Sequence, residues 1–458
     1  MTGRSDKGQP AAKPFLELAH AFRSGEDSPS ALLGRCLAVI DAREAELMAL
    51  TAINREGARD AAEASSKRWR DGRPLSAVDG MVIGVKDVIE TRDMPTQMGS
   101  ALFAGHSTGY DSASVRALRE AGAVILAKTV TTEFAATEPG PTRNPWDTSR
   151  TPGGSSSGSA AGVAAGYFNA ALGTQVVGSI LRPASYCGVF GMKPTVGAIN
   201  RGGSMDHMSQ SAQGVLAATV ADGWAVLRAI ADRAGGDPGH RGLVGPAAMP
   251  PVRVPHTIAL IETPGWAETG EAAKAALLWA AQRLREGGVA VRTRADCKEV
   301  EAVEAALGRA MLLTRKINAW ESRFPLNTFS DRDASKLSQT MRDRLKEAEG
   351  LTLDEYRDHI TEREQIQSVY ARLASVAEAS ITLCAPAEAP VGIKATGNPV
   401  FVVPGSLLGV PAVSLPLLSL NRLPFGLQVL GYQHRDGELM ATAAAIEAIV
   451  GSTQAARA

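Results

Sequence analysis

The sequence predicts a single α/β domain, and three features of the chain lead to this prediction. Residues 81–85 and 124–127 are short apolar runs rich in β-branched side chains, which is the composition of buried strands. Residues 111–122 have the amphipathic pattern of a helix, and the order helix, glycine, apolar strand is typical of an α/β sheet. No Gly/Ser stretch is long enough to separate two domains, so we expect the 458 residues to fold as one unit.

The segments before the first predicted strand have helical patterns. Residues 1–14 are polar and are predicted to form a disordered tail, so the domain is expected to cover 15–458. The Ser-Pro-Ser sequence at 28–30 marks a helix start, because Ser is a capping residue and Pro is tolerated in the first turn. A second, alanine-rich helix is expected over 43–69.

The rest of the chain alternates between strands, loops and helices. Residues 139–158 are rich in Pro, Gly, Ser, Thr and Asn and are predicted to form a long irregular loop. The stretch from about 235 to 380 carries long charged helices, and we interpret it as a helical elaboration within the same domain. The other predicted elements are a helix over 159–166, a turn over 175–183, strands over 189–194 and 257–261, helices over 272–286, 299–315 and 344–374, strand and turn segments over 381–430, and a final helix over 436–450.

The composition argues against several functional classes. Lys plus Arg and Asp plus Glu both number 48, so the net charge is zero, and neither nucleic acid nor an anionic membrane is expected as a partner. The chain shows no secretion signal and no apolar run of about 18 residues, so we expect a cytoplasmic protein. The cysteines are scattered, without metal-ligand spacing, and are predicted to be reduced: Cys36, Cys187, Cys297 and Cys384.

Two Gly/Ser-rich segments, 151–160 and 173–184, stand out from the rest of the sequence. Alone, such a segment is typical of a flexible surface loop. Phosphate-binding motifs are missing, because no Lys follows the glycines.

Together with a lysine at the end of the first predicted strand, these segments resemble the amidase-signature family. The resemblance rests on Gly84-Val85-Lys86-Asp87, Gly153-Gly154-Ser155-Ser156 and Gly178-Ser179, and on flanking blocks at 144–147, 187–195, 409–416 and 424–431. It runs from about residue 28 to 450. The fold that it implies is a mixed, twisted central sheet covered by helices on both faces.

The resemblance also implies a role for each residue of the site. Ser179 would be the nucleophile, Lys86 the base, and Ser155, preceded by a cis Gly154–Ser155 bond, would relay protons between them. The backbone N–H groups that would form the oxyanion hole belong to Val176, Val177, Gly178 and Ser179. No metal and no organic cofactor are implied.

These roles agree with elementary chemistry. A serine hydroxyl is a poor nucleophile until a base within hydrogen-bond reach takes its proton. A lysine can be that base only when it is neutral, so burial must lower its pKa. Lys86 follows a buried apolar run, which would carry its side chain into the interior.

The sequence departs from the family pattern at three places. The family most often has Asp at the position of Gln175, Gly at Val177, and Arg one position before Arg182. Loss of a buried carboxylate together with its cation destabilises a protein less than loss of either one alone. We therefore interpret the chain as a variant branch of the family. Val177 is expected to crowd the oxyanion loop, which would restrict the acyl group. The residues expected around the catalytic set are Gly154, Gln175, Arg182 and His207; whether Arg182 braces the loop stays open.

The function predicted from this resemblance is hydrolysis of C–N bonds in aryl or small amides and in carbamates (urethanes). One alternative is the amidase subunit of a tRNA-dependent amidotransferase, which would need a partner chain. Another is a non-catalytic binding protein on the same fold. The expected partner is a small-molecule amide or carbamate substrate, and a homodimer is left open.

Overall fold

Eleven strands form one continuous sheet in the computed structural model, which describes residues 11–451. The strands are β1 (Leu50–Ile53), β2 (Val82–Lys86), β3 (Val124–Thr129), β4 (Ala170–Gln175), β5 (Phe190–Lys193), β6 (Ala212–Ala217), β7 (Thr257–Leu260), β8 (Ala290–Arg292), β9 (Ala379–Leu383), β10 (Ala412–Leu420) and β11 (Leu423–Leu430). Their order in the sheet is β1-β3-β2-β4-β6-β5-β10-β11-β9-β7-β8. Strand pairs β2–β3, β2–β4, β7–β8 and β7–β9 are parallel and the others antiparallel, which confirms the predicted mixed sheet.

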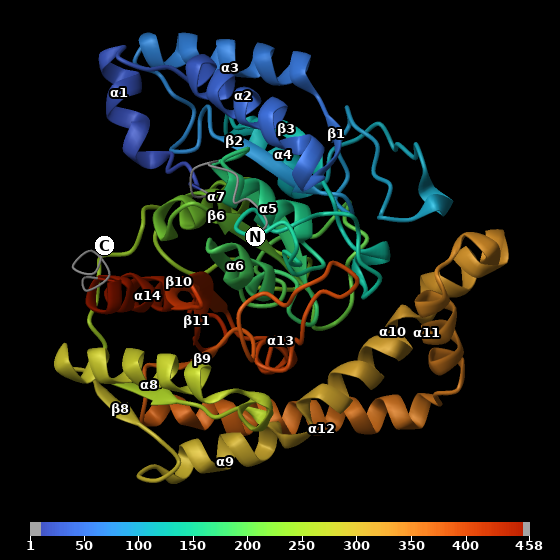
Figure 1. Cartoon of the computed structure of the whole chain (residues 1–458), viewed down its shortest axis with the longest axis vertical. Helices are drawn as coiled ribbons and strands as arrows, with labels where there is room; N and C mark the ends of the chain where they lie inside the picture. The colour runs from blue at the N-terminus through green and yellow to red at the C-terminus, as the bar shows by residue number, and fades with distance from the viewer. Residues whose placement is uncertain (1–10, 452–458) are drawn as a thin grey trace, which may run out of the picture.

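Helices surround this sheet (Figure 1). The α-helices are α1 (Ala19–Ser24), α2 (Pro29–Leu47), α3 (Arg55–Arg70), α4 (Ala113–Glu120), α5 (Ser157–Ala165), α6 (Leu181–Cys187), α7 (Val220–Ala234), α8 (Glu271–Glu286), α9 (Lys298–Ala306), α10 (Ala310–Asp333), α11 (Gln339–Glu349), α12 (Leu353–Arg372), α13 (Val403–Leu407) and α14 (Asp436–Gly451). Single 3-10 turns lie at Leu16–Leu18, Ala101–Phe103, Glu133–Ala135, Pro264–Glu268, Leu307–Arg309, Ala334–Lys336 and Leu373–Ser375.

Both faces of the sheet are covered, as predicted. In β6 the Cβ position of Gly214 points toward Ile180 beside α6, whereas the next residue, Val215, packs against Gly223 of α7. Successive residues of a strand point to opposite faces, so α6 and α7 lie on opposite sides of the sheet. Helix α5 approaches so closely that a Cβ on Gly158 would lie 2.1 Å from the Ala49 carbonyl oxygen, which explains the glycine there.

The N-terminal helices differ from the prediction at one point. Ser28 caps α2 by accepting a hydrogen bond from the Ala31 N–H, as expected. The second helix expected over 43–69 is wrong as a continuous element, because α2 ends at Leu47 and strand β1 intervenes before α3. Strand β1 pairs with β3 at the edge of the sheet, and this pairing overrides the helical propensity of the alanine-rich sequence.

Other predicted elements differ in smaller ways. The turn expected over 175–183 gives way to helix α6 from Leu181. The helix expected over 344–374 is interrupted at Gly350, and α12 begins with a capping box between Thr352 and Glu355. Of the predicted disordered tail, residues 1–10 lie outside the described residues, and the carbonyl of Lys13 accepts a hydrogen bond from Asn169 Nδ2.

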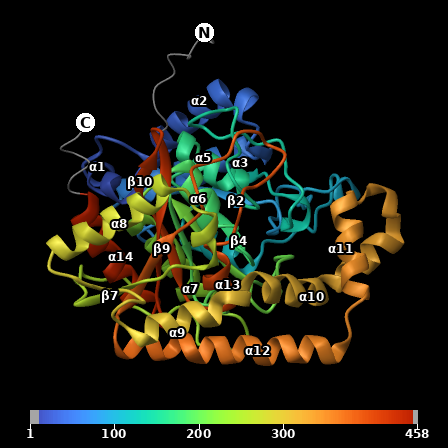
Figure 2. The ribbon, with the colours of Figure 1, turned by 60° about the horizontal axis from the view of Figure 1, so that its bottom comes forward.

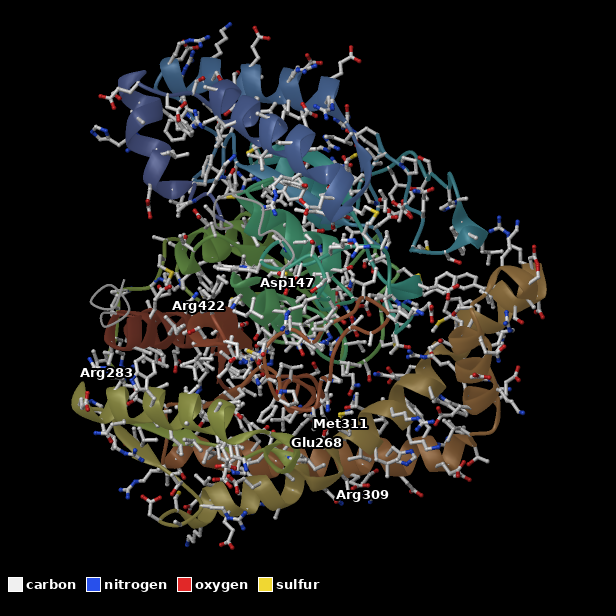
Figure 3. The ribbon with its side chains drawn as sticks, in the orientation of Figure 1. Asp147, Glu268, Arg283, Arg309, Met311 and Arg422 are labelled. Atoms are coloured by element: carbon white, nitrogen blue, oxygen red, sulfur yellow. The ribbon has the colours of Figure 1, made fainter. Side chains whose placement is uncertain are left out.

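The stretch 235–380 contributes more than helices, because β7 and β8 join one edge of the sheet. Its helices α10, α11 and α12 form an arm whose far end is α11 (Figures 1 and 2). Arg309, which precedes α10 and is labelled in Figure 3, forms an ion pair with Glu362 of α12 at 2.9 Å. At the far end, the Ser338 N–H donates to the buried Glu133 carboxylate of the domain body at 3.3 Å. The first contact therefore joins two helices of the arm, and the second attaches its far end to the domain body.

Two further predictions concern the whole chain. All four cysteines are buried and unpaired, and their reduced state stays a prediction. Within residues 11–451, none of the helices combines the length and the apolar character needed to cross a membrane.

Candidate active site

Neighbouring strands bring the three predicted catalytic residues together at the carboxyl ends of β2 and β4. Lys86 is the last residue of β2, and Ser179 follows the end of β4. These two strands are parallel neighbours, with Val85 opposite Leu172, so their carboxyl ends meet. In open α/β sheets, ligands bind at such ends. Ser155 reaches the same place from the loop that precedes α5.

Lys86 lies in direct contact with Ser155. Its Nζ atom donates to Ser155 Oγ at 2.7 Å, to Thr174 Oγ1 at 2.7 Å and to the Thr174 carbonyl at 3.3 Å. The side chain of Lys86 is fully buried. The Gly154–Ser155 peptide bond is cis, as the family resemblance implied.

Burial lowers the pKa of the Lys86 amine from its usual value to about 7, although the Asp206 carboxylate opposes this shift. An amine with that pKa is neutral in a large fraction of molecules at neutral pH. Because only a neutral amine can accept a proton, the environment of Lys86 meets the physical requirement for a base.

Ser179 lies in the wall of a cavity, and its side chain is not hydrogen-bonded to the Lys86–Ser155 pair. Among residues 11–451, no side chain or backbone group forms a hydrogen bond with Ser179 Oγ. The structure therefore makes the Lys86–Ser155 contact but not the Ser155–Ser179 contact that the resemblance implied. Catalytic hydrogen bonds are often long in unliganded enzymes and shorten when substrate binds.

The loop before Ser179 has free backbone donors. The N–H groups of residues 176–179 donate to none of the acceptors in the described part of the chain. Gly178 packs against Val402, and a Cβ there would lie 2.2 Å from Val402 Cγ2, so only glycine fits. The loop thus presents unpaired donors of the kind that stabilise an oxyanion.

Gln175 holds this loop in place with a neutral amide. Its Oε1 atom accepts hydrogen bonds from the N–H groups of Ile180 at 2.9 Å and Leu181 at 3.0 Å, which caps the start of α6. Its Nε2 atom donates to Ser406 Oγ at 3.0 Å, and Ser406 Oγ donates to the Val177 carbonyl at 3.1 Å. Gln175 therefore performs a bracing role without the carboxylate that is usual in the family.

Ser406 and Thr174 are site residues that sequence analysis missed. Ser406 lies in α13, more than 200 positions from the loop that it contacts, and no motif marks it. Thr174 lies within the second Gly/Ser-rich segment, so its proximity to Ser179 in the sequence was a usable signal.

We expect Ser406→Ala to lower kcat by about tenfold and the free energy of unfolding by about 1–3 kcal/mol. The substitution leaves the buried Gln175 amide and the Val177 carbonyl each without one partner. Steady-state kinetics and urea unfolding measure the two effects. Ser380→Ala is the matched control, because it removes a buried hydroxyl that contacts Tyr370, away from the cavity. Equal kcat values in the two variants would contradict a role for Ser406 in positioning the loop.

Arg182 contacts the serine loop. Its Nη2 atom donates to the Gly154 carbonyl at 2.7 Å and to Thr396 Oγ1 at 3.0 Å. Arg182 is buried among the described residues without a carboxylate at ion-pair distance, and burial lowers its pKa to about 10. The side chain thus contacts the carbonyl directly before Ser155, on the serine loop and not on the oxyanion loop.

Asp87 supports the turn that follows Lys86. Its carboxylate forms a fully buried ion pair with Lys128 at 3.4 Å and accepts from the Gln97 N–H at 3.2 Å. Burial raises the pKa of Asp87 to about 6, and Lys128 only partly offsets this. Lys128 in turn donates to the Ile89 carbonyl at 2.6 Å. These contacts fix the backbone directly after the proposed base.

The site borders a cavity of about 930 Å³, a volume that includes the part open to solvent. Its wall includes Ser179 and a set of apolar side chains from both the domain body and the arm: Val88, Phe134, Val176, Val177, Met205, Leu326 and Met341. Phe329 of α10 stacks on Phe134 with ring centroids 4.9 Å apart, and this contact packs the arm against the body. The contribution of α10 and α11 to the cavity could not be read from the sequence.

Another part of the wall is the segment 396–399, of which Thr396, Gly397 and Pro399 line the cavity. Asn398 fixes it by donating to Glu268 Oε2 at 2.6 Å, and Figure 3 labels Glu268. His207 also lines the cavity, but it is exposed and its Nδ1 atom contacts the Met205 carbonyl at 2.7 Å. It makes no contact with Lys86, Ser155 or Ser179 among the described residues. No cluster of three or more metal-binding side chains occurs within residues 11–451.

Comparison with known proteins agrees with this geometry. The sequence model of the family described as Amidase matches residues 31–440. A glutamyl-tRNA(Gln) amidotransferase subunit of Chloroflexus aggregans (strain MD-66 / DSM 9485) is 44% identical over 47% of this chain, and the match spans 46%, about half, of that relative's length. The corresponding glutamyl-tRNA(Gln) amidotransferase subunit of Salinispora arenicola (strain CNS-205) is 30% identical over 95% of this chain and 96% of its own length.

Solved structures share the fold over nearly the whole chain. The crystal structure of an amidase has a TM-score of 0.82 at 28% identity and covers 96% of this chain and 100% of its own. The structure of 6-aminohexanoate cyclic dimer hydrolase has a TM-score of 0.81 at 25% identity and covers 96% of this chain and 97% of its own.

Proposed function

Since the chain belongs to the amidase family, whose members hydrolyse amides, we propose that it cleaves the C–N bond of aryl or other small amides, and of carbamates, through an acyl-enzyme on Ser179. The observation that carries the proposal is the contact between buried Lys86, with a pKa of about 7, and Ser155. This pair lies beside the cavity whose wall contains Ser179.

The proposed reaction moves one proton through Ser155 in each direction. As Ser179 Oγ attacks the carbonyl carbon, it gives its proton to Ser155, and Ser155 gives its own proton to neutral Lys86. The negative charge on the carbonyl oxygen is stabilised by N–H groups of residues 176–179. Lys86 then returns the proton through Ser155 to the leaving nitrogen, and the C–N bond breaks. Water attacks the acyl-enzyme with the same proton relay and releases the acid.

The cavity wall supports a substrate with an aryl or other apolar group. Phe134, Met205, Leu326 and Met341 supply apolar surface, and Val177 lines the cavity close to the nucleophile in the sequence. A carbamate has the same planar carbonyl next to nitrogen as an amide, so the same groups suit both substrates. The 6-aminohexanoate cyclic dimer hydrolase, with the same fold, is named for a cyclic amide, which supports small amides as a class.

We expect the purified chain to release 4-nitroaniline from 4-nitroacetanilide and from ethyl 4-nitrophenylcarbamate. The two compounds share the leaving amine, so the ratio of their kcat/KM values reports the preference for amide over carbamate. Absorbance of 4-nitroaniline measures both. A folded enzyme that turns over neither compound would contradict the aryl-substrate part of the proposal.

A second candidate is the amidase subunit of an amidotransferase. It is favoured by the name of the relatives, one of which matches over nearly its whole length. The neutral Gln175 in place of the usual carboxylate disfavours it. This candidate requires glutamine hydrolysis that increases when partner chains bind, whereas the first candidate is active alone. Ammonia release from glutamine, measured on the isolated chain and on any complex that copurifies with it, separates the two.

A further inference from the structure

Arg344 of α11 lines the same cavity as Ser179 but has no carboxylate partner. Its Nε atom donates to Ser322 Oγ at 3.0 Å, and its Nη2 atom donates to the Asn318 carbonyl at 3.4 Å. Both acceptors are neutral. No acidic side chain within residues 11–451 lies at ion-pair distance from this guanidinium.

The acidic groups near Arg344 are engaged elsewhere. Glu347 pairs with Arg315 at 3.0 Å and with Lys316 at 3.2 Å. Glu321 accepts from the Ser209 N–H at 2.7 Å and from the Tyr356 hydroxyl at 2.9 Å.

Asp206 lines the cavity as well, and its Oδ1 atom accepts from Ser211 Oγ at 2.6 Å. Burial lowers the pKa of Arg344, and the more distant Asp206 and Glu347 only oppose this shift. The side chain of Arg344 is half-buried, and its guanidinium has no direct counter-ion among the described residues.

A half-buried cation that lines a cavity without a carboxylate partner attracts an anion that enters the cavity. The planar guanidinium of arginine matches the geometry of a carboxylate, which accepts two parallel N–H bonds. The other cation of the cavity wall, Arg182, already uses its Nη2 atom to hold the serine loop. Arg344 is thus the group that remains for an anion inside the cavity.

We propose that Arg344 binds a carboxylate of the substrate, so the preferred substrate is an amide that carries a carboxylate away from the bond to be cut. This inference rests on the proposed function, because it places the recognition site in the cavity of the proposed nucleophile. The apolar side chains between the two polar groups would hold the linking part of the substrate. Because Arg344 lies on the arm, the arm would set the specificity of the enzyme.

Two matched substrate pairs test this inference. On the acyl side, glutaryl 4-nitroanilide is compared with pentanoyl 4-nitroanilide, which ends in a methyl group. On the amine side, 4-acetamidobenzoate is compared with 4-methylacetanilide. In at least one pair, the wild type should favour the carboxylate compound in kcat/KM by about 10- to 100-fold, the range of charged hydrogen bonds.

Arg344→Gln should remove this preference while kcat/KM for the neutral compound stays within about threefold of the wild-type value. Arg344→Lys should retain part of the preference, since it keeps the charge but not the planar donor pair. Arg357→Gln is the control. It removes the same charge from an exposed ion pair on α12 and should leave kcat/KM unchanged for both compounds. Equal losses for both compounds in Arg344→Gln would instead assign Arg344 to packing against Asn318 and Ser322, and would overturn the inference.

A binding measurement separates failure of this inference from failure of the proposed function. Calorimetric titration of Ser179→Ala with the same pairs reports affinity without turnover. The inference is supported if Ser179→Ala binds the carboxylate compound more tightly and the double variant Ser179→Ala/Arg344→Gln does not. This outcome counts even when the wild type hydrolyses neither compound. Equal affinity within both pairs overturns the inference, even when the wild type hydrolyses the neutral anilides.

Discussion

Ser179→Ala is expected to reduce the hydrolysis of 4-nitroacetanilide by at least about 10⁴-fold, because no other group can form the acyl-enzyme at this position. The side chain is small and lies in the cavity wall, so the variant should fold and unfold like the wild type. Release of 4-nitroaniline measures the loss of turnover. Mass spectrometry with a fluorophosphonate should show one adduct on Ser179 of the wild type and none on the variant.

Ser157→Ala is a suitable control for this experiment. Ser157 lies in the other Gly/Ser-rich segment, two positions after Ser155, and its hydroxyl donates to the Val130 carbonyl outside the cavity. The control should keep wild-type activity and labelling. Turnover retained by a folded Ser179→Ala variant would mean that another group is the nucleophile. A folded wild type that takes no label and has no turnover would instead favour the non-catalytic binding protein that the sequence left as an alternative.

The strands that carry the site could be predicted because their signals are local. Residues 81–85 and 124–127 are apolar runs bounded by glycine or charged residues, and they correspond to β2 and β3. The short edge strand β1 could not be predicted in this way. Its residues have an alanine-rich neighbourhood, and they extend only because β3 offers a partner.

The same contrast holds within the site. Lys86, Ser155 and Ser179 lie in motifs that resemble those of the amidase-signature family, so the sequence predicted them as a set. Ser406 is an isolated serine whose function depends on the position of a loop more than 200 residues away. Arg344 is one of many charged residues on a charged helix, and nothing local separates it from its exposed neighbours. Tertiary contacts alone reveal both.

The proposed catalytic groups and the residues proposed to select the substrate lie in different parts of the chain. The proposed catalytic groups come from β2, β4 and the loops beside α5, all within the first 190 residues. Part of the cavity wall comes from the arm, including Leu326, Met341 and Arg344. The arm is fixed to the body through Glu133 and Phe134, so its substitutions can change the cavity without moving Lys86. This arrangement lets substrate preference vary while the reaction stays the same.

The activity of the wild type should rise with pH and reach half of its maximum near pH 7. Lys86 must be neutral to accept a proton, and burial lowers its pKa to about 7, so its protonated, inactive form predominates at lower pH. Replacement by methionine or arginine should reduce kcat by about 10³-fold or more at every pH, since methionine is no base and arginine stays protonated. Profiles of kcat/KM between pH 5 and 9 measure both effects.

Lys193 provides the control, because burial also lowers its pKa to about 7 but it lies outside the cavity. Lys193→Met should keep the pH profile of the wild type; loss of the profile in this variant would contradict the assignment to Lys86.

Stability gives an independent check. The folded state holds Lys86 at a lower pKa than the unfolded chain, so unfolding takes up a proton between about pH 7 and 10 and the wild type loses stability as pH falls through that range. Lys86→Met removes this loss, so its Tm should exceed that of the wild type by more at pH 7 than at pH 9. A variant that is inactive but gains no relative stability at lower pH would mean that Lys86 is not held neutral in the folded enzyme.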